Sequence, residues 1–156
     1  MAVLNALAVA ASGVTAAVYL YFAVRVMPAL ARTAPPRAVA RMQELNRAIV
    51  RSPFIVAFFG AAVLGGYQVV QLLGGGWGSS DVLTGVAGLA YVAGFALTIG
   101  YHVPRNARLE RFGAGHAGEV YWVTYQREWN RANVIRAGLS TASVGLGIAA
   151  LVGSGG

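Results

Sequence analysis

Long apolar blocks alternate with shorter polar connections along this sequence. The blocks, which we expect to be helical, cover residues 2–24, 53–73, 82–101 and 134–153. A helix of about 20 mostly apolar residues crosses the roughly 30 Å hydrocarbon core of a bilayer. The last block contains Arg136, which we expect to snorkel to the interface or to face a polar interior. The pattern predicts an all-α integral membrane four-helix bundle that forms a single domain over residues 1–156.

The polar connections also have a helical period. The apolar stripe of residues 37–51 consists of Ala38, Met42, Leu45 and Ile49. Arginine and glutamate side chains occupy much of the other faces, a pattern typical of an amphipathic helix that lies at a membrane surface. Residues 119–136 are expected to form a helix that continues without a break into the fourth span. We therefore predict an amphipathic cytoplasmic surface helix between spans one and two, and a long helix leading into span four.

The distribution of arginine predicts the orientation of the chain. Six arginines lie around the connection between spans one and two, six lie between spans three and four, and none lies between spans two and three. Arginine-rich connections remain on the cytoplasmic side of a membrane. We therefore expect a multi-pass protein of the cell (inner) membrane. Both arginine-rich connections would be cytoplasmic, and both termini and the glycine loop at residues 74–80 would lie outside.

Composition narrows the class of protein further. Hydrophobic residues make up 57% of the 156 residues and charged residues 11%, whereas soluble domains have about 25% charged residues. This balance excludes an ordinary soluble enzyme. A net charge of +7 is a feature of nucleic-acid-binding proteins, but here the arginines adjoin apolar spans, so we expect lipid and no nucleic acid as partner. The chain has no cysteine, which excludes disulfides and thiolate metal sites.

Two short features recur along the chain. A Met-Pro pair at residues 27–28 and a Val-Pro pair at residues 103–104 each have an arginine four residues after the proline. Each leads through a basic stretch into another span, which predicts a duplicated two-span unit.

Small residues four apart lie at Ala61 and Gly65, at Ala90, Gly94 and Thr98, and at Gly138 and Ala142. They favour close helix packing, either within the bundle or in a homo-oligomer or larger membrane complex.

Familiar chemical motifs are weak in this chain. Residues 113–118 match G-x-G-x-x-G, but the dinucleotide fingerprint requires a preceding strand, so we expect a loop. His102 and His116 are the only histidines. A zinc or iron site requires three or more clustered donors, so no metal site is predicted. No acidic residue lies within a predicted span, which disfavours a transporter with an ion pathway.

A polar and aromatic stripe precedes the fourth span. Its members are Trp122, Gln126, Trp129, Asn133 and Arg136, with Tyr125 and Asn130 beside them. Their spacing places them on one helical face. Such groups are costly at membrane depth without partners. The candidate partners are Gln43, Glu44, Asn46 and Asn106. The stripe is either a polar latch that ties the cytoplasmic connections together or the wall of a pocket at the cytoplasmic interface.

Four segments occur in an order and at a spacing that match a known family. They are Met27-Pro28-Ala29-Leu30, Met42-Gln43-Glu44-Leu45-Asn46-Arg47, Val103-Pro104-Arg105-Asn106, and the stretch from Trp122 through Trp129 to Asn133-Val134-Ile135-Arg136. On these segments the chain resembles the anthrone-oxygenase-like family of small four-span membrane proteins, over nearly its whole length. One departure is His102, because the family often has asparagine before the Val-Pro pair.

The resemblance implies a function and a set of site residues. Some members of the family are oxygenases that convert anthrones to anthraquinones without an obvious metal or flavin. This implies a cofactor-independent oxygenase that acts on a lipophilic aromatic substrate at the cytoplasmic interface. Such chemistry needs a base, donors for a developing oxyanion and an apolar slot. The candidate catalytic residues are His102 or Glu44 as base and Arg136 as donor. The candidate substrate-binding residues are Trp122, Tyr125, Trp129, Asn133, Asn106, Asn46 and Gln43.

The competing hypothesis is a non-catalytic accessory or structural subunit of a larger membrane complex. An enclosed cavity of about 300 Å³ or more, lined by at least two residues of the stripe, favours an enzyme. A closed latch, with the small-residue faces buried against other chains, favours a structural subunit.

Overall fold

The computed structural model describes residues 2–75 and 78–154, and these residues form helices and turns without a strand. The elements are α1 (Ala2–Tyr21), η1 (Phe22–Val26), α2 (Met27–Ala31), α3 (Pro35–Val50), α4 (Phe54–Leu73), α5 (Ser79–Leu97), η2 (Thr98–His102), α6 (Val103–Phe112) and α7 (His116–Gly153). The labels η1 and η2 denote single π-helical turns. Trp77, an interfacial anchor candidate of the glycine loop, lies outside the described residues.

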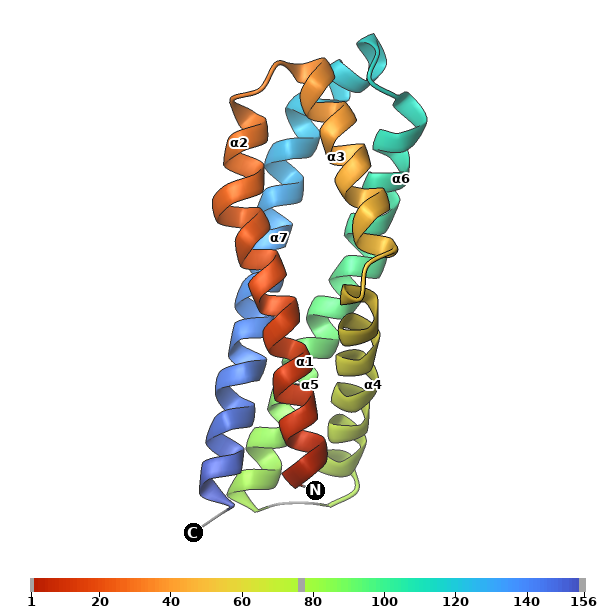
Figure 1. Ribbon diagram of the computed structural model, residues 1–156. Coiled ribbons are helices and arrows are strands. Elements are labelled where there is room, and N and C mark those ends of the chain that lie inside the picture. The colour runs from red at the N-terminus through yellow and green to blue at the C-terminus, as the bar shows by residue number, and fades with distance from the viewer. Residues whose placement is uncertain (1, 76–77, 155–156) are drawn as a thin grey trace.

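Four helices are long and apolar enough to cross a membrane, as predicted. They cover Ala2–Ala31, Phe54–Leu73, Ser79–Phe112 and His116–Gly153. The chain is therefore an all-α, multi-pass membrane protein whose helices contact lipid. Three of the helices are longer than their apolar blocks. They continue into a polar region at one end of the bundle, where their apolar sides pack against each other instead of against lipid (Figure 1).

Each proline pair of the predicted repeat follows a π turn. The N–H of Met27 donates to the carbonyl of Phe22, and the N–H of Val103 donates to the carbonyl of Thr98, five residues back in both cases. A proline inside a helix has no N–H to donate and clashes with the carbonyl four residues earlier. The wider π turn changes the hydrogen-bond register just before the proline, so the helix continues. The two motifs therefore share a backbone feature as well as a sequence pattern.

Close packing through small residues holds the bundle together. A Cβ atom added at Gly88 of α5 would lie 2.5 Å from the carbonyl oxygen of Gly65 of α4, so only glycine fits there. Ala61 and Gly94 are also buried within the bundle. The small-residue faces of α4 and α5 thus pack internally. In contrast, Gly138 and Ala142 of α7 are exposed.

The predicted amphipathic helix is α3, and its apolar side meets protein. Ala38, Val39 and Met42 have no exposed surface and pack in a core cluster with residues of α2, α6 and α7. Leu45 and Ile49, also assigned to the apolar stripe, are only partly buried. Figure 1 shows α3 folding back along α6 and the first half of α7 before the chain enters α4. The connection between spans one and two thereby becomes part of the bundle.

The ends of the bundle differ in their connections. Figure 1 shows the start of α1, the end of α7 and the α4–α5 connection at one end, and the α2–α3 and α6–α7 connections at the other. The second connection contains the G-x-G-x-x-G segment. Gly113 there has φ +66°, which favours glycine, and a Cβ atom on Gly118 would overlap the Gly113 carbonyl. Only residues 113–115 form the turn between α6 and α7, and residues 116–118, expected to belong to a loop, are the first turn of α7.

Candidate functional site

A cavity of about 140 Å³ is lined by residues of both π turns and of the helices around them. Its aromatic and aliphatic lining consists of Val18, Tyr19, Phe22, Ile49, Val50, Phe54, Ile55, Phe58, Val103 and Trp129. Its polar lining consists of Asn46, Thr98, His102, Asn106, Asn133 and Arg136. The lining thus comes from α1, η1, α3, α4, η2, α6 and α7, so the cavity exists only when the whole bundle is assembled.

Arg136 is the central polar residue of the cavity, although its side chain is only 4% exposed. Its Nη1 donates to Thr98 Oγ1 at 3.1 Å and its Nη2 donates to Asn133 Oδ1 at 2.9 Å. The guanidinium carbon lies 4.1 Å from the centre of the Tyr19 ring and 5.5 Å from that of Trp129. Its Nε is buried without a hydrogen-bond partner, and none of the ion pairs between described residues includes Arg136. The structure therefore buries a positive charge with neutral partners only.

Asn133 fixes the position of Arg136. Its side chain is fully buried, and its Nδ2 donates to the backbone carbonyl of Tyr19 at 2.9 Å. Its Oδ1 accepts the hydrogen bond from Arg136. Because Tyr19 belongs to α1, this amide joins α1 to α7 and sets the guanidinium between two aromatic rings.

His102 lies in η2 and is 1% exposed. Its Nδ1 is 3.5 Å from the carbonyl oxygen of Leu97, and its Nε2 is 3.3 Å from that of Trp129. The imidazole ring meets the indole of Trp129 edge to face, with centroids 5.1 Å apart. Both ring nitrogens therefore face backbone carbonyls.

Asn106 forms the predicted latch with the aromatic residues of α7. Its Oδ1 accepts from the hydroxyl of Tyr125 at 2.8 Å and from Nε1 of Trp129 at 2.9 Å. Both bonds use the amide oxygen, so the amide NH₂ remains to donate elsewhere. The latch ties α6 to α7 and orients the indole of Trp129, which forms one wall of the cavity.

A sequence model of the family described as anthrone oxygenase matches residues 46–146, nearly two thirds of the 156 residues. This chain belongs to the anthrone oxygenase family. The comparisons with curated proteins and with solved structures gave no match. The family match covers all of α4, α5, η2 and α6 and most of α7, and it begins at Asn46. It therefore includes Asn46, Thr98, His102, Asn106, Asn133 and Arg136 of the cavity lining, but not Tyr19.

The structure brings together six of the residues predicted for the site of this anthrone oxygenase family member. Those six are His102, Arg136, Trp129, Asn133, Asn106 and Asn46. Trp122 and Tyr125 are buried in the core cluster and Gln43 donates to the Leu109 carbonyl at 2.9 Å, and none of these three lines the cavity. The N-terminal part of the expected stripe, around Tyr125, thus contributes to the latch. Its C-terminal part, from Trp129 to Arg136, lines the cavity.

Glu44, a candidate base, lies at the protein surface and does not line the cavity. Its side chain is 61% exposed and its Oε2 is 2.6 Å from Nη1 of Arg41, one turn earlier on α3. The helical period explains the difference: Glu44 lies on the solvent-facing side of α3, whereas Asn46 lies on the side that reaches the cavity. The sequence neighbours of Glu44 resemble the family, but its carboxylate does not line the site.

Several lining residues had no role in the prediction from sequence. Tyr19 and Phe22 lie three residues apart, and Phe54 and Phe58 lie four apart, so each pair shares a helical face. That spacing was the only sequence pattern by which these lining residues could have been predicted. It also occurs wherever a span packs in a bundle, so it does not distinguish a cavity wall from a core.

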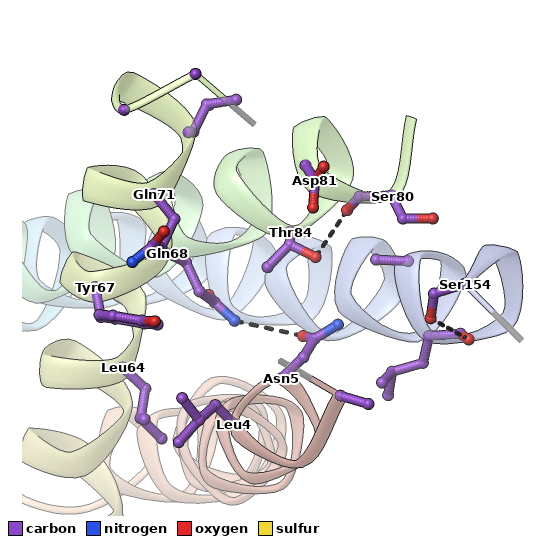
Figure 2. A pocket seen from close by; sticks show the side chains of 16 residues that line it. Leu4, Asn5, Leu64, Tyr67, Gln68, Gln71, Ser80, Asp81, Thr84 and Ser154 are labelled. Carbon is purple, nitrogen blue, oxygen red and sulfur yellow. Dashed lines mark hydrogen bonds between the residues drawn. The ribbon is translucent and has the colours of Figure 1, made fainter. Parts of the chain in front are cut away.

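Another cavity, of about 590 Å³, lies at the end of the bundle that holds the termini, and Figure 2 shows the side chains that line it. There Gln68 Nε2 donates to Asn5 Oδ1 at 3.3 Å, and Asn5 Nδ2 donates to the Gly147 carbonyl at 3.2 Å. Asp81 is the one charged side chain among its described lining residues. None of the candidate site residues lies there, so the smaller cavity is the candidate site of the anthrone oxygenase family member.

Proposed function

We propose that this protein is a cofactor-independent oxygenase that oxidises a lipophilic, anthrone-type aromatic substrate in the cavity around Arg136. The observation that carries the proposal is a buried guanidinium without a counter-ion, set in an aromatic cavity. In the reaction, a ring CH₂ group becomes a carbonyl. One atom of dioxygen enters that carbonyl, and the other leaves as water with the two hydrogens.

The residues of the cavity divide this task between them. Phe22, Phe54 and Trp129 form flat apolar surfaces against which a fused aromatic ring system packs. The guanidinium of Arg136 and the amide NH₂ of Asn106 donate to the substrate oxygen on which negative charge develops. Donors held in place before the reaction stabilise such charge strongly in a mostly apolar site. The family resemblance implied that both Trp122 and Trp129 bind the substrate, and in this proposal Trp129 does so alone.

The size of the cavity sets a condition on substrate binding. At about 140 Å³ it is smaller than the roughly 300 Å³ at the lower end of ordinary ligand sites, so it does not meet the size that the sequence analysis set as favouring an enzyme. Its rim includes Ile49, Val50 and Ile55, on either side of the turn between α3 and α4. A three-ring substrate therefore requires this rim to move outward. Because Val50 is 65% exposed at the surface of the bundle, the rim is the side from which a lipophilic molecule reaches the cavity.

The test uses two neighbouring β-branched residues of α4 whose side chains point in different directions. Ile55 lines the cavity, whereas Val56 is 77% exposed. Ile55→Trp fills the cavity and is expected to lower the rate of anthrone oxidation roughly 100-fold, as misplacement of a substrate by about 1 Å does. Val56→Trp is expected to retain the rate. The measurement is anthraquinone formation by purified protein in mild detergent, with the protein-free autoxidation rate subtracted.

Two results of this experiment would contradict the proposal. One is oxidation no faster than the protein-free background. The other is equal activity of the two tryptophan variants. Stoichiometric partner proteins in the same native preparation, together with absent oxidation, would instead support an accessory subunit.

The proposal includes an orientation in the membrane, with both arginine-rich connections in the cytoplasm. Because the chain has no cysteine, single cysteines report this directly. A membrane-impermeant maleimide should label Ser79→Cys in intact cells, and should label Thr33→Cys and Ala114→Cys only after lysis. Labelling of Thr33→Cys and Ala114→Cys from opposite sides would contradict the topology.

A further inference from the structure

The cavity also indicates in which ionisation state it takes its substrate. We infer that it binds an already ionised molecule, a planar aromatic acid in its delocalised enolate or phenolate form, and that it contains no base to ionise the neutral acid. This inference rests on the proposed function and names the substrate class of the same site. It depends on the charge of the cavity, its hydrogen-bond donors and its lack of a proton acceptor.

The charge of the cavity is positive and is not compensated. The carboxylates of the described chain lie elsewhere. Glu44 pairs with Arg41, Glu110 with Arg47 and Glu128 with Arg105, Glu119 lies in the first turn of α7, and Asp81 lies at the opposite end of the bundle. An arginine remains protonated in proteins, so the charge of Arg136 persists. A buried charge is costly unless it is paired, and a ligand anion supplies the missing pair.

The guanidinium keeps N–H groups for that anion. Nη1 and Nη2 of Arg136 each use one of their two N–H groups on Thr98 and Asn133, and Nε is buried without any hydrogen-bond partner. Nδ2 of Asn46 on α3 is also buried without one, and this side chain lies close to Tyr125. Both groups are donors, and both belong to residues that line the cavity. An anionic oxygen accepts from such donors more strongly than a neutral one does.

No group in the cavity is placed to remove a proton. The titratable residues that line it are Tyr19 on α1, His102 on η2 and Arg136 on α7, and α3 and α4 contribute only amide and apolar side chains. Whichever tautomer His102 adopts, its unprotonated nitrogen faces a backbone carbonyl and not the cavity. A proton on His102 would also add a second positive charge near Arg136 and Arg105. The hydroxyl of Tyr19 lies 3.3 Å from that of Thr98.

The groups behind the cavity do not change this conclusion. The Tyr125 hydroxyl donates to Asn106, and Arg105 pairs with Glu128 at 3.4 Å. The imidazole of His102 therefore acts as a positioning group that joins η2 to α7 through the Trp129 carbonyl. The proton of the substrate must leave to water before the molecule enters the cavity.

The chemical step balances without a base in the site. The bound carbanion transfers electron density to dioxygen, and a carbon–oxygen bond forms to give a peroxide anion. Water protonates this anion. That protonation releases hydroxide, which removes the remaining ring hydrogen as water. The electron pair of the broken C–H bond forms the carbonyl while the O–O bond breaks and the terminal oxygen leaves as hydroxide. Carbon is oxidised and dioxygen is reduced, with no further reductant.

The first test measures binding without turnover. The probe is 2-hydroxyanthraquinone, whose phenolate absorbs at longer wavelength than the phenol. Wild-type protein in micelles is expected to lower the apparent pKa of the bound dye by about one unit or more relative to micelles alone. Arg136→Gln should abolish the shift, and Arg131→Gln, which changes an exposed arginine of the same helix, should retain it. An unshifted dye pKa with folded wild-type protein would overturn the inference.

The second test needs only the wild-type protein, so it does not depend on the folding of a variant. The dependence of kcat/KM on pH is measured for two anthrones of different acidity. The limb in which activity rises with pH should move with the pKa of the substrate. A limb at the same pH for both anthrones would belong to a base of the protein and would overturn the inference. A dye shift without any anthrone oxidation would contradict the proposed function but support anion binding.

Discussion

Two buried asparagines make similar hydrogen bonds with different consequences: Asn5 lies near the end of the bundle that holds the termini, and Asn133 lies near the middle of α7. Asn5 donates its Nδ2 to the carbonyl of Gly147 and accepts on Oδ1 from Gln68. Asn133 donates its Nδ2 to the carbonyl of Tyr19 and accepts on Oδ1 from Arg136. In each case one amide joins α1 to α7 within the membrane protein. Both asparagines therefore stabilise the packing of α1 against α7.

The partner of each amide makes the difference. Gln68 is neutral, and its bond to Asn5 pairs two amides with each other. Arg136 is charged, keeps an unpartnered Nε–H and lines a cavity. The larger cavity, of about 590 Å³, surrounds the neutral pair, and the smaller one, of about 140 Å³, surrounds the charged residue. The sizes of these two cavities do not identify the candidate site, whereas an uncompensated charge and an unpartnered donor distinguish the smaller cavity.

The largest expected effect comes from removing the amide that holds Arg136. Asn133→Leu leaves the Tyr19 carbonyl and one guanidinium nitrogen without a partner, so we expect a loss of about 2–4 kcal/mol in the free energy of unfolding. Anthrone oxidation should also be lost. Unfolding by SDS titration in mixed micelles measures the first effect. Asn130→Leu is the matched control on α7 because the Asn130 Oδ1 is already unpartnered, and an equal loss there would contradict this explanation.

An intermediate effect is expected from the close contact of α4 and α5. Gly88→Ala places a Cβ atom 2.5 Å from the Gly65 carbonyl oxygen, so the helices must separate. We expect a loss of about 1–3 kcal/mol in unfolding free energy, with the activity of the folded fraction retained. Gly66→Ala meets nothing within 4 Å and serves as control. If both alanine variants were equally stable, the contact would not be a packing constraint.

The smallest effect is expected at the neutral pair. Gln68→Leu removes one hydrogen bond to Asn5, and side-chain hydrogen bonds between membrane helices contribute about 0.6 kcal/mol on average. Stability should fall by about that amount and oxidation should be unchanged, as in the exposed control Gln71→Leu. A loss of oxidation in Gln68→Leu alone would show that the larger cavity takes part in the function, and the contrast between the two asparagines would fail.

Much of this architecture was predictable because hydrophobic period and length determine which segments cross a bilayer. The four spans, the long α7 and the shared face of Trp129, Asn133 and Arg136 follow from spacing along one helix. Glu44 shows the limit of such reasoning. It lies two residues from Asn46 in a segment that resembles the family, yet it faces away from the cavity, because neighbours two apart on a helix point in different directions.

The sequence by itself determined the membrane class, the helical elements, the segregation of arginine into two connections and the family. Each of these properties depends on residues close together in the chain or on sums over such residues, such as hydropathy and charge. Only the tertiary structure decided that both π turns contribute to one cavity, that Tyr19 and Thr98 meet Arg136, and that this arginine has no acidic partner among the described residues. Such contacts join residues far apart in the sequence, and they depend on helix rotation and crossing, which no local pattern encodes.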